Sequence, residues 1–384
     1  MKRVLIFGSS GSIGRSTLEI IRKNKRDFKV IGLSVNKNID MLYRQIKEFS
    51  PSYVCVVNER AAKRLKKKLL GKIKVLYGEE GLREFSSLPA DISVMGIVGI
   101  SSLMPFITSL KHSKRVALAS KEVLVVAGDI VKREVKKNKA ELIPVDSEIN
   151  ALFQLLGCIK REHLKKIYIT ASGGPLLDYS SSSLKRVTPS MVLTHPNWRM
   201  GKRITVDSAT LVNKGFEVME SHHLFDLDYE MIDVVVHRQS YVHAFVETKD
   251  SMLFSCWYKP NMVIPLAFSL YYPQRSFLGR GFDVSFSHFN LSFKKVNYRK
   301  FPLFRIVLEA AKKGGNFPIA VNAADEIAVR FFLEKKIKFY DIYRAVEHIF
   351  SKTKKDKVSS LKGVYFWDKW ARVKTEEFLN KLCG

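Results

Sequence analysis

The feature that most restricts the fold is a glycine-rich turn that follows the first apolar run of the chain. Residues 8–14 read Gly-Ser-Ser-Gly-Ser-Ile-Gly and come directly after the strand-like segment Val4–Phe7. An amphipathic stretch, predicted as a helix over 13–24, begins where the turn ends. Further short apolar runs alternate with amphipathic stretches as far as residue 145. This alternation predicts an α/β fold with a doubly wound, Rossmann-like parallel sheet.

The turn is predicted to bind a nucleotide, because glycines allow backbone N–H groups to approach a pyrophosphate at a helix N-terminus. Its spacing, G-x-x-G-x-x-G, is a variant of the dinucleotide-binding fingerprint. The second predicted strand ends near Val35 and runs into Asn36-Lys37-Asn38, with no acid at that end. An acid would hold the ribose 2′-hydroxyl of NAD, whereas a lysine suits a 2′-phosphate, so NADP(H) is favoured. A purely structural turn and an exposed lysine in a lysine-rich chain are the alternatives.

Charge separates two classes of function for this chain of 384 residues. Its 65 Lys+Arg against 37 Asp+Glu give a net charge of +28, which fits a nucleic-acid binder or an enzyme of anionic substrates. The basic residues are spread along the chain and do not alternate with aromatics as in single-strand binders, so the enzyme is favoured. The spread of the basic residues therefore predicts that the protein does not bind nucleic acid. Four scattered cysteines and the lack of a secretory signal predict a cytoplasmic protein. No apolar run approaches the ~20 residues of a membrane span, so no membrane binding is predicted.

Beyond residue 145 the pattern changes. Four strand-like segments and a long helix near 209–222 predict a central α+β domain over 146–276. The segment 277–300, which alternates apolar and polar residues, is predicted as a strand or a linker. From 301 to 384 apolar residues recur at helical spacing, which predicts a C-terminal α-helical domain.

Two acidic residues at the end of a predicted strand form a candidate metal site. Asp146 and Glu148 flank Ser147, and strand alternation would place the two carboxylates on one face. Crowded carboxylates repel unless a cation or a proton lies between them, and oxygen ligands alone suit Mg²⁺ or Mn²⁺ rather than zinc. A solvated strand end that caps the following helix is the alternative.

Further candidate residues lie in the second half of the chain. Asn213, Lys214 and Glu217 are three or four residues apart, so a helix places them on one side, where they could hold a phosphate and a metal together. An ordinary ion pair between Lys214 and Glu217 is the alternative. Ser172, followed by Gly173-Gly174, offers a hydroxyl and backbone N–H groups as an anion site, or forms a simple turn.

The segment 194–201, Thr-His-Pro-Asn-Trp-Arg-Met-Gly, has Pro and Gly on either side of Trp198. It is predicted as a mobile loop that closes over a ligand and excludes water, and a surface loop around a packed tryptophan is the alternative. Two histidine sets, His222-His223 and His237 with His243, lack convincing metal-ligand spacing and are interpreted as structural.

In combination, these segments resemble the 1-deoxy-D-xylulose 5-phosphate reductoisomerase family of the non-mevalonate isoprenoid pathway. The matching motifs occur in family order over nearly the whole chain: GSSGSIG, NKN, SKEVLV, PVDSEINALFQ, TASGGP, THPNWRMG, TVDSATLVNKGFEVMESHHLF, HRQSYVH and VNAADEIAV. The resemblance implies an NADPH-binding domain over 1–145, a catalytic, metal-binding and dimerisation domain over 146–276 with a lid loop near 194–203, the linker 277–300 and a helical domain over 301–384. It also implies a homodimer.

The resemblance assigns roles to single residues as well. A divalent metal (Mg²⁺, Mn²⁺ or Co²⁺) would be held by Asp146, Glu148 and Glu217. The phosphorylated sugar substrate would contact Lys121, Ser147, Glu148, Ser172, His195, Trp198, Ser208, Asn213, Lys214 and Glu217. NADPH would contact Ser10, Gly11, Ser12, Ile13, Asn36, Lys37, Asn38, Ser120, Glu122 and Gly201. The catalytic residues would be Lys121, Glu148, His195, Lys214 and Glu217.

The implied reaction rearranges 1-deoxy-D-xylulose 5-phosphate to a branched aldehyde phosphate, which NADPH reduces to 2-C-methyl-D-erythritol 4-phosphate. Another NADPH-dependent reductase, of the semialdehyde or homoserine dehydrogenase type, is the alternative and would need no metal held by carboxylates. Ser10, Asn36 and Ser120 replace the family's usual Thr, Gly and Asn. These departures concern cofactor affinity and leave every proposed metal ligand in place.

Overall fold

The computed structural model describes residues 1–69, 71, 73–180, 183–194, 197–198, 200–284 and 290–383. The chain forms two compact units. The first unit comprises 1–123, 131–150 and 261–282, and the second comprises 124–130, 151–260 and 283–384. Among the described residues, no helix combines the length and the apolar character that a membrane crossing needs.

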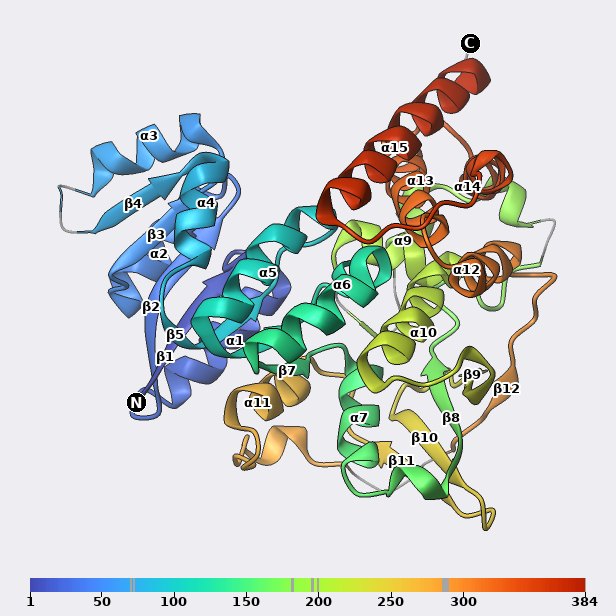
Figure 1. Ribbon diagram of the computed structural model, residues 1–384, viewed down its shortest axis with the longest axis horizontal. Helices are drawn as coiled ribbons and strands as arrows, with labels where there is room; N and C mark the ends of the chain where they lie inside the picture. The colour runs from blue at the N-terminus through green and yellow to red at the C-terminus, as the bar shows by residue number, and fades with distance from the viewer. Residues whose placement is uncertain are drawn as a thin grey trace. The chain divides into compact units, whose positions relative to one another are not determined.

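A seven-stranded sheet forms the centre of the first unit, and all neighbouring strands in it run parallel (Figure 1). Its order is β4-β3-β2-β1-β5-β6-β7, which confirms the predicted doubly wound arrangement. The strands are β1 (Lys2–Phe7), β2 (Phe28–Val35), β3 (Tyr53–Val56), β4 (Lys74–Tyr77), β5 (Ala90–Met95), β6 (Ser113–Leu118) and β7 (Glu141–Pro144). The helices between them are α1 (Ser12–Lys23), α2 (Ile39–Phe49), α3 (Glu59–Lys68), α4 (Gly78–Ser86), α5 (Leu103–His112) and α6 (Glu122–Asn138).

The core of the first unit includes a helix from much later in the chain. Residues Val4–Phe7 of β1 are all fully buried, as expected for a parallel strand with both faces covered. Helix α11 (Val263–Tyr271) contributes Leu266 and Leu270 to the same hydrophobic cluster. The chain therefore returns to the first unit after most strands of the second. The predicted domain boundaries at 145, 276 and 300 stay predictions.

The second unit is built on a five-stranded mixed sheet with the order β11-β10-β8-β9-β12. Strands β8 and β9 run parallel, and the other neighbouring pairs run antiparallel. The strands are β8 (Leu164–Ala171), β9 (Ile232–Val236), β10 (Val242–Thr248), β11 (Leu253–Trp257) and β12 (Lys294–Lys295). Together with the helices around it, this sheet confirms the predicted central α+β region, and β12 lies within the segment predicted as a strand or a linker.

Helices complete the second unit. They are α7 (Ser147–Leu156), which begins in the first unit, α8 (Pro189–Val192), α9 (Lys202–Thr210), α10 (Val212–Phe225), α12 (Pro302–Lys313), α13 (Phe317–Leu333), α14 (Phe339–Lys352) and α15 (Leu361–Cys383). The last four confirm the helical C-terminal region. The long helix predicted near 209–222 is confirmed as α10, which begins at Val212 because Leu211 adopts φ +60° and separates α9 from α10. Only tertiary packing holds a leucine in this costly conformation, and Leu211 is buried.

Candidate active site

The glycine-rich turn has the backbone geometry of an anion site. Gly8 follows β1 with φ +75°, and a Cβ there would lie 2.6 Å from the carbonyl oxygen of Gly96. A Cβ on Gly14 would lie 2.4 Å from Cα of Ser9, so both positions need glycine. Helix α1 begins with Gly11 as its N-cap, which offers no side chain to cap the first N–H groups. These groups and the helix dipole suit a nucleotide phosphate. Of the predicted NADPH contacts, Ser10 and Gly11 lie in the turn, and Ser12 and Ile13 open α1.

A contact that the sequence did not reveal holds this turn against α2. Ser9 is fully buried, and its hydroxyl donates to Gln45 Oε1 at 2.7 Å. The Gln45 amide donates back to the carbonyl of Ser9 at 2.9 Å. The two residues are 36 positions apart, so no local pattern points to the pair. These reciprocal hydrogen bonds fix the turn at the edge of the sheet.

Asn36, Lys37 and Asn38 follow β2, the strand next to β1, and all three are exposed. Asn38 caps α2, because its Oδ1 accepts from the N–H of Met41 at 3.2 Å. The carbonyl of Asn36 accepts from the N–H of Asn58 at 2.9 Å. Lys37 forms no ion pair with the described part of the chain, so its ammonium group is free to meet an anion from solvent.

Two neighbouring strands of the same sheet end in polar residues. Ser120, Lys121 and Glu122 follow β6, and Asp146 follows β7. Lys121 Nζ donates to Asp146 Oδ2, and both side chains are largely buried. Asp146 Oδ1 and the Ser120 hydroxyl are buried without a hydrogen-bond partner in the described ranges. A buried carboxylate oxygen without a donor costs free energy that a bound cation would recover.

The strand alternation predicted across Asp146 and Glu148 is wrong. Strand β7 ends at Pro144 and α7 begins at Ser147, so Glu148 lies in the first turn of a helix. The carbonyl of Asp146 accepts from the N–H of Asn150 at 2.8 Å, which places Asp146 at the helix N-terminus. The Ser147 hydroxyl donates to Glu148 Oε2. The two carboxylates share a helix start, where the dipole stabilises negative charge, rather than a strand face.

Helix α10 has an amide, a cation and a carboxylate in contact on one side. Asn213 Nδ2 donates to Glu217 Oε1 at 2.5 Å, and Lys214 Nζ donates to Glu217 Oε2. Lys214 is 4% exposed and Glu217 is 1% exposed. The intrahelical ion pair therefore exists, but its burial distinguishes it from a solvated surface pair. Charges are expensive to bury, so a pair of this kind is a candidate for function.

Three of these carboxylates are candidate metal ligands. Asp146 and Glu148 of the first unit and Glu217 of the second each offer one oxygen. Glu217 is buried, and the other two are partly buried. A set of carboxylate oxygens suits a hard divalent cation such as Mg²⁺ or Mn²⁺.

The turn after β8 packs against α9. Gly173 and Gly174 have φ +82° and +70°, and Ser172 Oγ accepts from the N–H of Gly174 at 3.2 Å. A Cβ on Gly174 would lie 2.5 Å from the carbonyl oxygen of Ser208. Ser208 and the Ser172 turn are therefore neighbours, as a shared phosphate site requires. Successive glycines with positive φ can form a concave backbone surface that binds anions.

Only part of the predicted lid loop is described. The Trp198 indole lies edge-on to the His243 ring, with the ring centroids 6.2 Å apart. Gly201 is exposed and forms the N-cap of α9. His195 lies outside the described residues, together with positions 196 and 199.

The histidines that the sequence analysis interpreted as structural make internal contacts. His243 stacks on Tyr258 with ring centroids 3.8 Å apart, and its Nε2 lies 3.1 Å from the Tyr258 carbonyl oxygen. His237 Nδ1 lies 3.0 Å from the Ser292 carbonyl oxygen, and burial lowers the pKa of this histidine. His222 Nδ1 lies 2.6 Å from the Leu227 carbonyl oxygen.

Comparison with known proteins gives the same family for all parts of the chain. The models for 1-deoxy-D-xylulose 5-phosphate reductoisomerase, its C-terminal domain and the DXP reductoisomerase C-terminal domain match residues 4–128, 142–225 and 258–374 respectively. The 1-deoxy-D-xylulose 5-phosphate reductoisomerase of Thermodesulfovibrio yellowstonii is 42% identical over 374 residues, which cover 97% of this chain and 98% of the relative. That of Sulfurihydrogenibium sp. is 40% identical over 377 residues, which cover 98% of each.

Solved structures agree with the sequence matches. The Zymomonas mobilis reductoisomerase in complex with NADPH has a TM-score of 0.90 and 34% identity, and the match covers 98% of this chain and 99% of that one. A DOX-P reductoisomerase in complex with NADPH, fosmidomycin and magnesium has a TM-score of 0.94 and 33% identity, over 100% of this chain and 99% of that one. Agreement at this level, over the full length, means that the chain belongs to the 1-deoxy-D-xylulose 5-phosphate reductoisomerase family.

Proposed function

We propose that the chain converts 1-deoxy-D-xylulose 5-phosphate to 2-C-methyl-D-erythritol 4-phosphate with NADPH, and that Asp146, Glu148 and Glu217 hold the divalent cation that the reaction needs. The match of three family models along the chain is the observation that carries this proposal, and Asp146, Glu148 and Glu217 offer the carboxylate oxygens that such a cation needs. Relatives solved with NADPH and with magnesium support both cofactors. A semialdehyde or homoserine dehydrogenase type is not favoured, because it has no need for a carboxylate-held metal and the three matching family models are those of the reductoisomerase.

The chemistry of the donor set fits a hard cation. All donors are carboxylate oxygens, and Asp146 Oδ1 is buried with no hydrogen-bond partner within the described ranges. Lys121 donates to Asp146 and Lys214 donates to Glu217, so each of these two carboxylates has an ammonium group beside it. When bound, the cation supplies Lewis acidity toward the substrate's carbonyl and adjacent hydroxyl oxygens, and NADPH supplies the hydride.

The substrate's phosphate is assigned to the region where the Ser172 turn meets α9. Ser172, Ser208, Asn213 and Lys214 offer hydroxyl, amide and ammonium groups, and Gly174 brings backbone close to Ser208. The phosphate is remote from the bonds that change, so its binding energy serves to orient the reacting carbons. Lys121, Ser147 and Glu148 are assigned to the reacting end of the substrate. His195 and Trp198 are assigned to the loop that covers it, and His195 lies outside the described residues.

NADPH is assigned to the carboxyl edge of the parallel sheet. The glycine-rich turn and the start of α1 would hold the pyrophosphate, through Ser10, Gly11, Ser12 and Ile13. Lys37, exposed between Asn36 and Asn38 at the end of the neighbouring strand, would contact the 2′-phosphate. Ser120, Glu122 and Gly201 complete the assignment and rest on the family resemblance alone.

We further propose that two copies of the chain pair through β11. This strand lies at the end of its sheet, and it carries Leu253, Phe254 and Trp257 at 57%, 43% and 39% exposure. Exposed apolar edge strands tend to pair with other strands, and a second copy would cover both the backbone and the side chains. Sedimentation should give a dimer for the wild type and a weaker dimer for Phe254→Lys. A monomeric wild type would remove the proposal.

A cytoplasmic location is part of the same proposal, since the four cysteines, Cys55, Cys158, Cys256 and Cys383, lie far apart in the sequence and form no C-x-x-C pair.

The direct test of the activity is NADPH oxidation with 1-deoxy-D-xylulose 5-phosphate. Treatment with EDTA should abolish turnover, and added Mg²⁺ or Mn²⁺ should restore it. NADPH binding, measured by its fluorescence, serves as the control and should survive the chelator. Full turnover in the presence of EDTA would contradict the assignment of the three carboxylates.

A further inference from the structure

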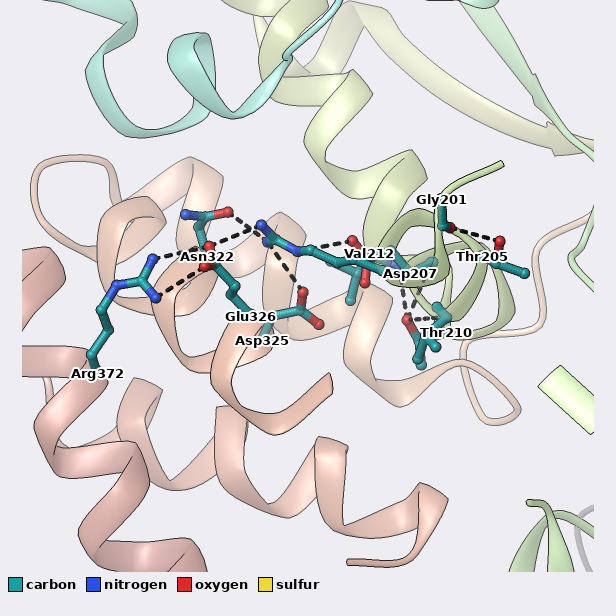
Figure 2. Close-up of polar contacts among 11 residues, drawn as sticks. Gly201, Thr205, Asp207, Thr210, Val212, Asn322, Asp325, Glu326 and Arg372 are labelled. Atoms are coloured by element: carbon teal, nitrogen blue, oxygen red, sulfur yellow. Dashed lines mark hydrogen bonds and ion pairs between the residues drawn. The ribbon is translucent and has the colours of Figure 1, made fainter. Parts of the chain in front are cut away.

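A buried polar cluster joins α9 to the C-terminal helices, and neither the sequence motifs nor the mechanism accounts for it. Arg203, in the first turn of α9, donates through Nη1 to Glu326 Oε2 at 3.0 Å and through Nη2 to Asn322 Oδ1 at 2.9 Å. Its Nη2 also lies 3.5 Å from Asp325 Oδ2, and its Nε lies 3.5 Å from Asp207 Oδ2 on its own helix. Figure 2 shows Asp207 on α9 facing Asn322, Asp325 and Glu326 on α13.

The cluster continues onto α15. Arg372 makes two hydrogen bonds with Glu326, at 3.0 and 2.9 Å, and one with Asp368 at 2.7 Å (Figure 2 draws Arg372 and Glu326). Glu326 is therefore shared between Arg203 on one side and Arg372 on the other. This carboxylate links the two arginines, which lie on different helices, Arg203 on α9 and Arg372 on α15.

Acidic groups outnumber the basic groups in this cluster. In the described part of the chain, Asp207, Asp325, Glu326 and Asp368 form ion pairs with Arg203 and Arg372, and Arg330 adds positive charge near Glu326. Asp325 is fully buried, and burial raises its pKa to about 6. Removal of either arginine would leave a buried carboxylate poorly compensated, so the chain has a strong reason to keep both. A planar guanidinium that contacts several acceptors at once also fixes direction, which a lysine does not.

Helix α9 connects this cluster to the residues assigned to the substrate's phosphate. At its far end, the Ser208 carbonyl oxygen lies 2.5 Å from a Cβ built on Gly174, and the Cα of Ala209 lies 2.9 Å from it. The hydroxyl of Thr210 accepts from the N–H of Val212 at 3.4 Å, across the break at Leu211 where α10 begins (Figure 2). A shift of α9 would therefore displace both the Ser172 turn and the start of α10.

We propose that Arg203 is a positioning residue for the substrate's phosphate: by binding α9 to Asn322, Asp325 and Glu326 of α13, it holds Ser208, the Ser172 turn and Asn213 in place. No contact with the phosphate is assigned to Arg203 itself. This inference rests on the proposed function, because it takes the phosphate contacts from there. It adds a role for the C-terminal helices, which become the support of the substrate site.

Steady-state kinetics of the full-length enzyme test the proposal. Arg203→Met should raise KM for 1-deoxy-D-xylulose 5-phosphate by about tenfold or more, because small displacements of binding groups cost up to about 100-fold. The same variant should weaken competitive inhibition by inorganic phosphate to a similar extent. KM for NADPH should stay within about twofold of wild type, since the glycine-rich turn is untouched. Arg203→Lys keeps the charge without the planar fork of the guanidinium, so its KM for the substrate should lie between those of the wild type and Arg203→Met.

The matched control is Arg372→Met, which removes the other arginine of the cluster and no contact of α9. It should lower the thermal midpoint as much as Arg203→Met does and leave both KM values and phosphate inhibition unchanged. Equal effects of Arg203→Met and Arg372→Met on KM would show that the cluster has only a structural role, and would overturn the proposal. A wild-type KM in both Arg203→Lys and Arg203→Met would also overturn it. If Arg203→Met fails to fold, a wild-type KM in Arg203→Lys alone overturns it. A wild type that does not turn over the substrate at all would instead refute the proposed function.

Discussion

Replacing Glu217 by glutamine is the substitution that examines the proposed metal site most directly. Both Glu217 oxygens already accept hydrogen bonds, Oε1 from Asn213 and Oε2 from Lys214. A glutamine has one acceptor and one NH₂ group, so either orientation turns a donor toward a donor. The change also breaks the buried ion pair between Lys214 and Glu217, and a broken buried ion pair costs about 3–5 kcal/mol. We therefore expect a thermal midpoint lower by roughly 5–10 °C.

The effect on turnover should be larger than the effect on stability. Loss of an outer contact to a metal ligand typically costs about 10–100-fold, so loss of a ligand should cost about 100-fold or more in kcat. Turnover is measured by NADPH oxidation at saturating Mg²⁺, below the thermal midpoint of the variant. NADPH affinity should stay within about threefold of wild type, because the substitution changes no residue of the glycine-rich turn.

A control separates the metal from the ion pair. Asp368→Asn makes the same carboxylate-to-amide change at a buried pair within one helix, where Arg372 Nε donates to Asp368 at 2.7 Å. It should lower the thermal midpoint and leave kcat nearly unchanged. Wild-type turnover in Glu217→Gln would remove Glu217 from the metal site, and a comparable kcat loss in Asp368→Asn would assign the effect to stability.

Two more predictions concern the cofactor and the buried cluster. Lys37→Glu should weaken NADPH by about tenfold or more and NADH far less, because only NADPH carries the 2′-phosphate; fluorescence titration that gives equal losses for both would refute the assignment. Burial raises the pKa of Asp325 from 3.8 to about 6, so the neutral form is favoured in the folded chain and its stabilisation is lost as pH rises through that range. Asp325→Asn should accordingly gain stability relative to wild type between about pH 4 and pH 6, as measured by urea denaturation, and a difference that does not change with pH would contradict the direction of the shift.

The strand, the turn and the helix start of the first unit could be predicted from the sequence because they depend on residues that are close together in the chain. Val4–Phe7 and the glycines at 8, 11 and 14 are contiguous, so a buried strand, a tight turn and a helix start are all written in one segment. The same holds for Asn213, Lys214 and Glu217, since helical spacing alone places them in contact. When the residues that contact one another lie within one or two helical turns in the sequence, their contact can be predicted without knowledge of the fold.

Where the sequence misled, two conformations compete over a short segment. Pro144 to Glu148 has too few residues for its period to separate a strand end from a helix start, and the helix prevails because the amide of Asn150 donates to the Pro144 carbonyl at 2.8 Å. Leu211 has a high intrinsic helix propensity, but its backbone has φ +60° and separates α9 from α10, because tertiary packing overrides that propensity.

By itself, the order of residues determined the parallel sheet, the nucleotide turn, the family and the types of side chain that chelation and phosphate binding require, because each of these depends on near neighbours in the chain. Folding in three dimensions decided which distant groups meet: Ser9 with Gln45, Lys121 with Asp146, and Arg203 with Asn322, Asp325 and Glu326. Such pairs leave no periodic trace, since their free energy comes from burial and from charge compensation between segments that only the completed fold brings together.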